Sequence, residues 1–247
     1  MQSAIRIGIA GWNLPSQHAA MFPGERQHLA RYAQRFSAVE INSSFYRPHR
    51  PATYARWAAT VPADFRFAVK LPREITHRRK LVDVDEPLDR FIAEAAALGE
   101  KRGPLLIQLP PSLAYTEAVA LRFLETMRER FDGALVCEPR HPNWFTDAVD
   151  AVLMRLRIAR VAADPAVVPP AAMPGGWPNL IYYRLHGAPK MYYSSYGPEQ
   201  LDGLAVALRA SLKRAGEAWC IFDNTARHAA TTDALSLIER LSDFVAA

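Results

Sequence analysis

Short runs of β-branched and other apolar residues alternate along the chain with longer stretches that carry an apolar residue every three or four positions. The short runs have the length and composition of buried β-strands, and the longer stretches have the periodicity of amphipathic helices. The predicted strands lie at residues 5–10, 38–42, 65–70, 105–109, 134–138, 158–163, 180–186 and 218–223. The clearest helical stripes lie at residues 29–36, 88–95, 120–131, 149–156, 201–208 and 234–241.

This alternation of strand and helix favours one fold class. A strand followed by a helix returns to pair in parallel with the next strand, and eight such units close most naturally into a barrel. The chain has 247 residues, which matches the roughly 250 residues of a typical β/α barrel. No Gly/Ser-rich linker divides the sequence. We therefore predict an α/β protein with a single domain spanning residues 1–247, a (β/α)8 TIM-type barrel, with an open doubly wound sheet as the alternative.

The predicted strand at residues 180–186 ends in charged and ionisable side chains. Successive side chains of a strand point to opposite faces, so Tyr182, Arg184 and His186 share one face. Burying a guanidinium and an imidazole is costly unless the groups are paired or face a wet cavity. This strand end is therefore expected to face a functional pocket.

Polar residues gather at the ends of the other predicted strands as well. In β/α barrels the catalytic residues lie at the carboxyl ends of the strands, where the loops after the strands meet. The longest loops, at residues 71–84, 165–179 and 187–197, also follow strands and would cover this face. The polar residues concerned are Glu40, Asn42, Lys70, Gln108, Glu138, Asp164, Arg184, His186, Asp223 and Asn224.

The net charge of +5 permits binding to anions, including nucleic acid, without identifying a partner. The tightest basic cluster, Arg-Arg-Lys at residues 78–80, suits a solvated loop or, together with Arg73, a rim that binds nucleic acid. No basic leader precedes a long apolar core, and no apolar run has the length of a membrane span, so we expect a cytoplasmic protein without membrane contact. Cys137 and Cys220 lie in apolar runs and are expected to be buried thiols.

The strand ends and the loops that follow them combine acids, cations and histidines. Clustered opposite charges shift one another's pKa, which brings a glutamate or histidine within reach of acid–base catalysis near neutral pH. An ion-pair network that satisfies itself and closes the end of the barrel is the structural alternative. The acids are Glu40, Glu138 and Asp164, the cations are Lys70, Arg140 and Arg184, and the histidines are His77, His141 and His186.

No cofactor is expected from the sequence. The glycine-rich segments do not follow the dinucleotide-binding or Walker patterns. Acids and histidines from separate strand ends could hold a divalent metal ion, but no local spacing marks a metal site and three nearby cations would repel the ion. If a metal binds, the expected ligands are Glu40, Glu138, Asp164 and His186.

Several short motifs occur in a fixed order along the chain. They include GW at residues 11–12, VEINSSFY at 39–46, FAVK at 67–70, QLPPS at 108–112, EPRH at 138–141, RLHG at 184–187 and FDNT at 222–225. Together they resemble the motifs of the YecE-like family, which is catalogued as a domain of unknown function. The resemblance covers about residues 5–237 and implies a TIM-type barrel with a pocket, without implying a reaction. Two positions depart from the family pattern, Asp223 where Asn is frequent and Pro139 where Phe is frequent.

These observations lead to the hypothesis of an enzyme that acts on a small anionic substrate, bearing phosphate or carboxylate, by acid–base hydrolysis or isomerisation. Glu40, Glu138 or His186 would move protons, and Asp164 would orient a histidine. Arginine forks and a lysine point charge suit an anionic group. The predicted substrate-binding residues are Asn42, Lys70, His77, Gln108, Arg140, His141, Arg184, Tyr193 and Asn224. The alternatives are a non-catalytic protein that binds a small ligand and a metal-dependent barrel that processes nucleic acid; the sequence indicates no oligomeric state.

Overall fold

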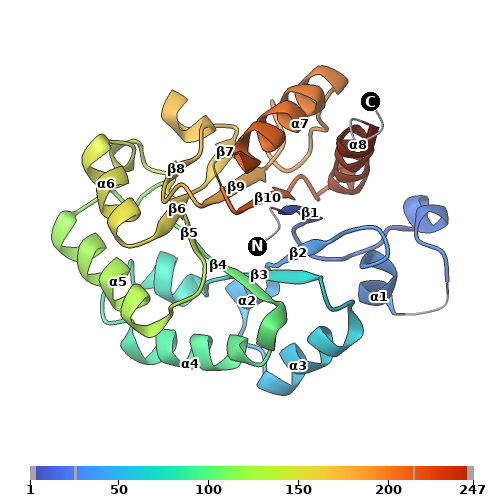
Figure 1. The fold of residues 1–247 in the computed structure, drawn as a ribbon. Helices are drawn as coiled ribbons and strands as arrows, with labels where there is room; N and C mark the ends of the chain where they lie inside the picture. The colour runs from blue at the N-terminus through green and yellow to red at the C-terminus, as the bar shows by residue number, and fades with distance from the viewer. Residues whose placement is uncertain (1–3, 25–26, 214, 244–247) are drawn as a thin grey trace.

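Strands lie at the centre of the molecule and helices surround them (Figure 1). The computed structural model describes residues 4–24, 27–213 and 215–243. The strands are β1 (Ala4–Ile9), β2 (Ala38–Ile41), β3 (Arg66–Lys70), β4 (Arg102–Gln108), β5 (Leu135–Glu138), β6 (Ile158–Arg160), β7 (Ala162–Asp164), β8 (Gly175–Gly176), β9 (Leu180–Leu185) and β10 (Glu217–Phe222). The α-helices are α1 (His28–Tyr32), α2 (Ser43–Tyr46), α3 (Pro51–Thr60), α4 (Asp85–Ala96), α5 (Glu117–Arg130), α6 (Asp147–Arg155), α7 (Pro198–Leu212) and α8 (Ala229–Asp243). Short helical turns are η1 (Ser16–Met21), η2 (Glu74–Arg78), η3 (Gly99–Lys101), η4 (Pro142–Trp144) and η5 (Pro169–Ala172).

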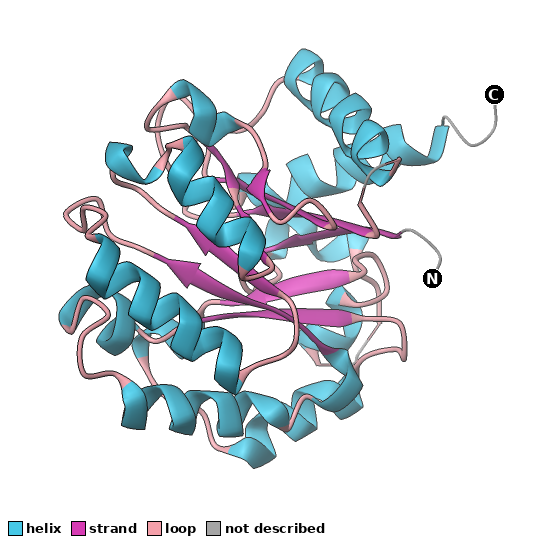
Figure 2. Cartoon of the chain, turned by 60° about the vertical axis from the view of Figure 1, so that its left-hand side comes forward, coloured by secondary structure: helices cyan, strands magenta, loops and turns pink. Residues whose placement is uncertain are grey.

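The strands form two sheets, whose orders are β1-β10-β9-β7 and β2-β3-β4-β5-β6-β8. All neighbours pair in parallel except β6 and β8, which are antiparallel. The edges of the two sheets meet on both sides. On one side Ala10, just after β1, forms a parallel bridge with Glu40 in β2; on the other side only Val161 separates β6 from β7. The parallel strands therefore follow one another around a ring with the helices packed outside it (Figure 2), which confirms the predicted α/β fold of TIM type.

Strands β1 and β2 approach each other closely at Gly8. A Cβ atom at this position would lie 2.2 Å from the carbonyl oxygen of Ala38, so glycine is required unless the backbone moves. Further along, the backbone N–H of Gly11 donates to the carbonyl oxygen of Glu40 at 2.9 Å. These contacts hold the carboxyl ends of β1 and β2 side by side and place Glu40 in the ring.

Between β7 and β9 the chain forms the long loop predicted at residues 165–179, so this unit differs from the others in having no α-helix. Residues 165–179 form the turn η5 and the short strand β8, which pairs antiparallel with β6, in place of an α-helix. The five prolines of this segment explain the difference, because proline lacks the backbone N–H that a helix interior needs. The single strand predicted at residues 158–163 is also divided, since β6 pairs with β5 while β7 pairs with β9.

Two helices between β2 and β3, α2 and α3, were not predicted from the sequence. In α3 Tyr54 is fully buried, and Trp57 and Ala58 pack against the same core, so an apolar stripe at helical spacing is present in the sequence and α3 was predictable from it. Helix α1 is shorter than the stripe at residues 29–36 suggests, because it ends at Tyr32.

Alternation of side chains along the strands divides the core into two parts. Residues on the outer face of the ring pack against the helices, and they include Cys137 and Cys220, which are buried and unpaired as predicted. The interior of the ring is filled by Ala38, Ala68, Leu106, Val136, Ala159, Val161, Leu180, Tyr182, Trp219 and Ile221. Two positions further along the same strands come Glu40, Lys70, Gln108, Glu138, Arg184 and Asp223. Because side chains repeat with a period of two along a strand, these polar residues form the next layer above the apolar interior.

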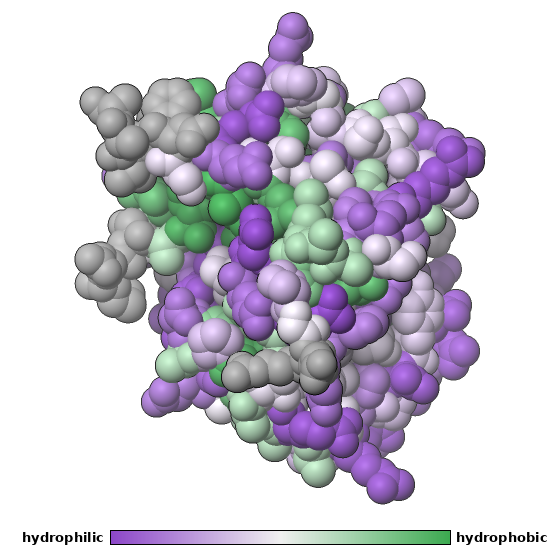
Figure 3. All heavy atoms as spheres, turned by 90° about the vertical axis from the view of Figure 1, so that its right-hand side faces the viewer, coloured by the Kyte–Doolittle hydropathy of each residue, from purple (hydrophilic) through white to green (hydrophobic). Residues whose placement is uncertain are grey.

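Apolar patches interrupt an otherwise largely hydrophilic surface on the face shown in Figure 3. Such patches are ordinary on folded proteins, because apolar atoms contribute more than half of a typical accessible surface. None of the helices in the described part of the chain combines the length and apolar character needed to cross a membrane.

Candidate functional site

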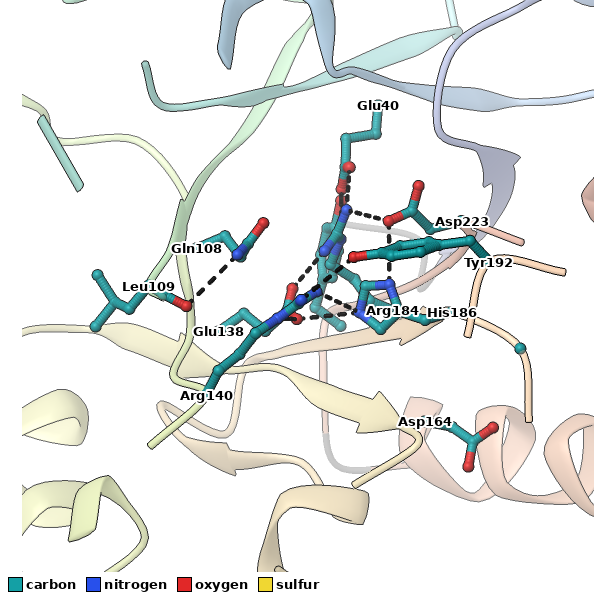
Figure 4. Close-up of polar contacts among 12 residues, drawn as sticks. Glu40, Gln108, Leu109, Glu138, Arg140, Asp164, Arg184, His186, Tyr192 and Asp223 are labelled. Carbon is teal, nitrogen blue, oxygen red and sulfur yellow. Dashed lines mark hydrogen bonds and ion pairs between the residues drawn. The ribbon is translucent and has the colours of Figure 1, made fainter. Parts of the chain in front are cut away.

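The polar layer at the carboxyl ends of the strands is organised around Arg184 (Figure 4). Arg184 is fully buried at the end of β9. Its Nε donates to Oε2 of Glu40 at 3.0 Å, and its Nη2 donates to Oε1 of the same carboxylate at 2.7 Å. Its Nη1 donates to Oε2 of Glu138 at 2.5 Å, and Nη2 also donates to Oδ2 of Asp223 at 3.1 Å. One guanidinium therefore binds three carboxylates that come from three other strands or strand ends.

This arrangement keeps Arg184 charged and occupied. Burial alone would lower the pKa of Arg184, but the adjacent carboxylates of Glu138, Glu40 and Asp223 raise it well above its usual value. All three side-chain nitrogens of Arg184 already donate to carboxylates. The structure thus places Arg184 at the centre of the cluster, where its charge balances acids of the protein.

His186 lies between two of the same carboxylates. Its Nδ1 is 3.0 Å from Oδ2 of Asp223, and its Nε2 is 3.0 Å from Oε1 of Glu138. Burial would lower the pKa of His186, but the charge of Glu138 and the hydrogen bonds to both acids raise it. A protonated ring can donate from both nitrogens at once. If Nε2 loses its proton, it can instead accept a hydrogen bond from Nη2 of Arg140, which lies 3.2 Å away.

Arg140 and Tyr192 close one side of this cluster. Arg140 donates from Nε to Oε1 of Glu138 at 2.9 Å and from Nη1 to the hydroxyl of Tyr192 at 3.3 Å. The ring of Tyr192 also meets the ring of His186 edge to face, with 5.8 Å between centroids. Burial would raise the pKa of Glu138, but Arg184, Arg140 and His186 hold it well below its usual value. Glu138 is therefore a carboxylate with three cationic neighbours.

Lys70, at the end of β3, differs from the other cations. Its side chain is mostly buried, since the residue is 8% exposed. Its Nζ lies over the ring of Phe45, 4.2 Å from the centroid, and no hydrogen bond or ion pair joins it to any residue that the structure describes. Burial, with a further contribution from Arg184, lowers the pKa of Lys70 to about 8. Lys70 is thus a mostly buried amine that contacts the ring of Phe45 but has no hydrogen bond or ion pair within the described residues, and its pKa lies close to neutral pH.

His77 accompanies Lys70 on the same side of the cluster. Its Nδ1 is 2.8 Å from the hydroxyl of Thr76, and its ring meets the ring of Phe45 edge to face at 4.8 Å. Burial and the charges of nearby cations, Lys70 first among them, lower the pKa of His77 to about 4. His77 is therefore neutral at physiological pH.

Not every residue predicted for the site joins this group. Asp164 accepts a hydrogen bond from the hydroxyl of Tyr196 at 2.7 Å, and Figure 4 shows it apart from the Arg184 cluster. The carboxylate of Asp223, rather than that of Asp164, contacts the ring of His186, while Asp164 accepts the backbone N–H of His186 at its carbonyl oxygen. His141 pairs with the side chain of Asn143 at 2.7 Å.

Tyr193 and Asn224 also have other contacts. Tyr193 is exposed and stacks with Lys190, whose Nζ is 4.4 Å from the ring centroid. Its neighbour Tyr192, which was not predicted as a site residue, reaches the cluster instead. Asn224 is fully buried and donates to Oδ2 of Asp233 at 2.7 Å, so it ties the end of β10 to helix α8. Gln108 lies in the polar layer, where its Nε2 reaches the carbonyl oxygen of Leu109 at 3.4 Å.

The geometry bears on the metal and nucleic-acid alternatives. Across the described residues, no group of three or more His, Cys, Asp or Glu side chains is placed to hold a metal ion. The guanidinium of Arg184 occupies the space between Glu40, Glu138 and Asp223 that such an ion would need. In the basic rim, Arg78 and Arg79 both pair with Glu74, at 3.3 and 3.0 Å. Part of the rim's charge is therefore balanced within the loop.

A cavity of about 500 Å³ lies at the same face of the molecule, beside the cluster. This volume falls within the range of ligand pockets, roughly 300–1,000 Å³. The cavity is bounded by the residues that follow β1, β2 and β10 and by the beginning of α8. The lining residues are Ile9, Ala10, Gly11, Trp12, Asn13, His28, Asn42, Ser43, Thr225, His228, Ala230 and Thr231. Asn42, one of the residues predicted to bind substrate, thus lines this cavity rather than the cluster around Arg184.

Comparison with known proteins identifies relatives of the chain. A family model described as "Protein of unknown function DUF72" matches residues 6–246. UPF0759 protein YecE of Escherichia coli K12 is 30% identical over 142 residues, which are 57% of this chain and 50% of YecE. UPF0759 protein YunF of Bacillus subtilis strain 168 is 25% identical over 151 residues, which are 58% of this chain and 52% of YunF. These matches span about half the length of the curated relatives.

Solved structures with the same fold cover nearly the whole chain. A DUF72 family protein from Enterococcus faecalis V583 has a TM-score of 0.81 at 21% identity, covering 97% of this chain and 96% of its own. A DUF72 family protein from Thermotoga maritima MSB8 has a TM-score of 0.80 at 22% identity, covering 96% of this chain and 99% of its own. At these identities the comparison shows the fold alone.

Proposed function

We propose that this chain, which belongs to the DUF72 family, is an enzyme that transfers protons on a small anionic substrate at the carboxyl ends of its strands. The reaction class is acid–base isomerisation or hydrolysis. Membership of this family does not indicate an activity, so the proposal depends on the chemistry of the residues around Arg184.

Lys70 is the observation that carries the proposal. A buried charge without a partner is costly, and proteins usually pair such a charge or neutralise it. Lys70 has neither a hydrogen bond nor an ion pair within the described structure, yet it lies in a layer where other charged side chains are paired. An anionic oxygen of a substrate would supply the missing partner. A lysine whose pKa is lowered to about 8 is also suited to exchange a proton near neutral pH.

His186 and Glu138 are the proposed proton-transfer pair. The ring of His186 can hold a proton against Glu138, or lose it and accept from Arg140, without a change of position. Asp223 holds the opposite ring nitrogen at 3.0 Å and orients the imidazole. This assignment gives Asp223 the orienting role that the sequence hypothesis gave to Asp164, and it gives Arg184 the role of balancing the acids.

The test compares Lys70→Met with Lys213→Met in a thermal-shift screen of anionic metabolites. Methionine keeps a long apolar side chain over Phe45 and removes the charge, whereas Lys213 is exposed just after α7. A ligand at 100 times its Kd stabilises the native state by about 2.7 kcal/mol. For a chain of this size that corresponds to a Tm increase of roughly 5–10 °C.

We expect organic anions that stabilise the wild-type protein and Lys213→Met to lose most of their effect on Lys70→Met, whereas inorganic phosphate alone is not expected to depend on Lys70. A metabolite that stabilises the protein should also be converted, which mass spectrometry of the incubated ligand would detect. Retained affinity in Lys70→Met would contradict the role of Lys70, and a screen without any stabilising anion would contradict the substrate class.

A non-catalytic ligand-binding protein is the second candidate. The observation that favours it is the number of charges that already satisfy one another, above all Arg184 with its three carboxylates. In that case a stabilising anion would be recovered unchanged after long incubation, and substitution of His186 by Gln would leave its affinity in place.

A further inference from the structure

The cavity beside the cluster contains polar groups that the proposed chemistry does not use. It begins where β1, β2 and β10 end, and the first turn of α8 forms one of its walls. Helix α8 has 15 residues, so its amino end carries a substantial partial positive charge. Helix ends of this kind favour anions, but an end alone does not make a site.

Thr231 supplies an independent observation. It lies in the first turn of α8, lines the cavity and is only 2% exposed. Its backbone N–H donates to the carbonyl oxygen of His228, whereas its hydroxyl has no hydrogen-bond partner among the residues described. A buried hydroxyl normally has such a partner. The remaining open side of this hydroxyl is the cavity, where a ligand oxygen could bind to it.

Asn42, on the opposite wall, has a second unused group. Its Oδ1 is buried without a hydrogen-bond partner in the described structure. Oδ1 can only accept, so the group that completes it must be a donor, such as a hydroxyl, and because Oδ1 is enclosed the amide must rotate to meet a ligand in the cavity. The cavity also contains Trp12, an indole ring of the kind that stacks on sugars, and Gly11, where an added Cβ would meet nothing within 4 Å. The backbone N–H groups of Ala230 and Thr231 already donate to the carbonyl oxygens of Asn224 and His228. The walls thus offer the hydroxyl of Thr231 to an anion at α8 and, once its amide rotates, Oδ1 of Asn42 to a hydroxyl.

The wall of the cavity is tied to the strand that carries Lys70. Ser43 lines the cavity, and the next residue, Ser44, donates from its hydroxyl to the carbonyl oxygens of Ile41 at 2.9 Å and Lys70 at 2.7 Å. The ends of β2 and β3 are therefore fixed to each other. Lys70 itself is not among the residues that line the cavity.

We propose that this cavity is a subsite for the phosphate and adjacent hydroxyl of a phosphorylated sugar or polyol. The phosphate lies against the first turn of α8 and the hydroxyl of Thr231, and a sugar hydroxyl donates to Oδ1 of Asn42. The inference rests on the proposed function and names its substrate class. Binding at the subsite does not require turnover of a substrate, so it can be tested without an activity assay.

The first experiment measures binding of inorganic phosphate to the full chain by amide NMR and by thermal shift. Thr231→Val removes the hydroxyl with almost no change of volume, and Thr232→Val, an exposed position on the same helix turn, is the matched control. We expect phosphate to shift amide signals at the start of α8, with a Kd at least fivefold weaker in Thr231→Val and unchanged in Thr232→Val.

The second measurement separates this subsite from the proposed function. Lys70→Met should bind inorganic phosphate as the wild-type protein does, because its substitution lies outside the cavity lining. Loss of phosphate binding in Lys70→Met, equal binding in the two threonine variants, or no binding by the wild-type protein would each overturn the subsite. Phosphate affinity that is unchanged in Lys70→Met and weakened in Thr231→Val supports the subsite even if no anion is turned over.

The third measurement tests the hydroxyl contact. Ribose 5-phosphate is titrated beside inorganic phosphate against the wild-type protein and Asn42→Leu. We expect ribose 5-phosphate to bind at least fivefold more tightly than phosphate to the wild-type protein and to lose that advantage in Asn42→Leu. An advantage that survives in Asn42→Leu would remove Asn42 from the subsite.

Discussion

Replacement of Arg184 by Met should destabilise the protein strongly. The guanidinium is fully buried and balances Glu40, Glu138 and Asp223 through four hydrogen bonds. Removing one partner of a buried ion pair leaves an uncompensated charge and costs about 3–5 kcal/mol. Since 1 kcal/mol corresponds to roughly 2–4 °C in a chain of this size, we expect the Tm at pH 7 to fall by about 6–20 °C.

The pH dependence of the Tm difference gives a second, independent test of this prediction. In the wild-type protein the pKa values of Glu138 and Asp223 are lowered, so their contribution to stability is complete above the unfolded-state pKa values of about 4 and is lost as pH falls through the folded-state values. Without Arg184 the effect of burial is offset less, so we expect the pKa values of the same carboxylates to rise. Acidification from pH 7 towards pH 5 should therefore narrow the difference in Tm between Arg184→Met and the wild-type protein.

The assay is thermal unfolding followed by circular dichroism at pH 7, 6 and 5, with Arg122→Met as the control. Arg122 is an exposed residue of α5, and its substitution should change stability by no more than about 0.5 kcal/mol. A Tm decrease below about 2 °C in Arg184→Met would refute the reasoning, because the acids would then be balanced without Arg184. A difference that widens on acidification would refute the assignment of the charge states.

Two further predictions concern His186 and the closure of the ring. The raised pKa of His186 means that its stabilising contribution is complete below the unfolded-state pKa of about 6.5 and is lost as pH rises through the folded-state value; NMR titration of the ring should show this, and Glu138→Gln should lower the pKa. Gly8→Ala should cost about 1–3 kcal/mol, because its Cβ would lie 2.2 Å from the carbonyl oxygen of Ala38. Gly203→Ala, in α7 with open space around the added Cβ, should instead stabilise the helix by up to about 1 kcal/mol. Urea unfolding of Gly8→Ala and Gly203→Ala measures both changes in the free energy of unfolding.

The alternation of strands and helices was predictable because it depends on local periodicity, which a sequence displays directly. The pairing inside the cluster was not predictable in the same way. Arg184 could have faced a ligand, as the sequence suggested, or the acids of neighbouring strands. The outcome depends on the relative register of β2, β5, β9 and β10, and register between distant strands is determined by packing of the whole ring.

The alternation of side chains along a strand could nevertheless have shown which of Asp164 and Asp223 joins the cluster. Along β6 and β7, Ala159 and Val161 face the interior of the ring. Asp164 is an odd number of residues away from both, so its side chain points to the other face, where it meets Tyr196. In β10, Trp219 and Ile221 face the interior, and Asp223 continues that phase. The phase of the apolar interior residues thus predicts which acid reaches the cluster, whereas position at a strand end alone does not. Applied to the remaining strands, the same test retains Glu40 and Glu138, two positions after Ala38 and Val136.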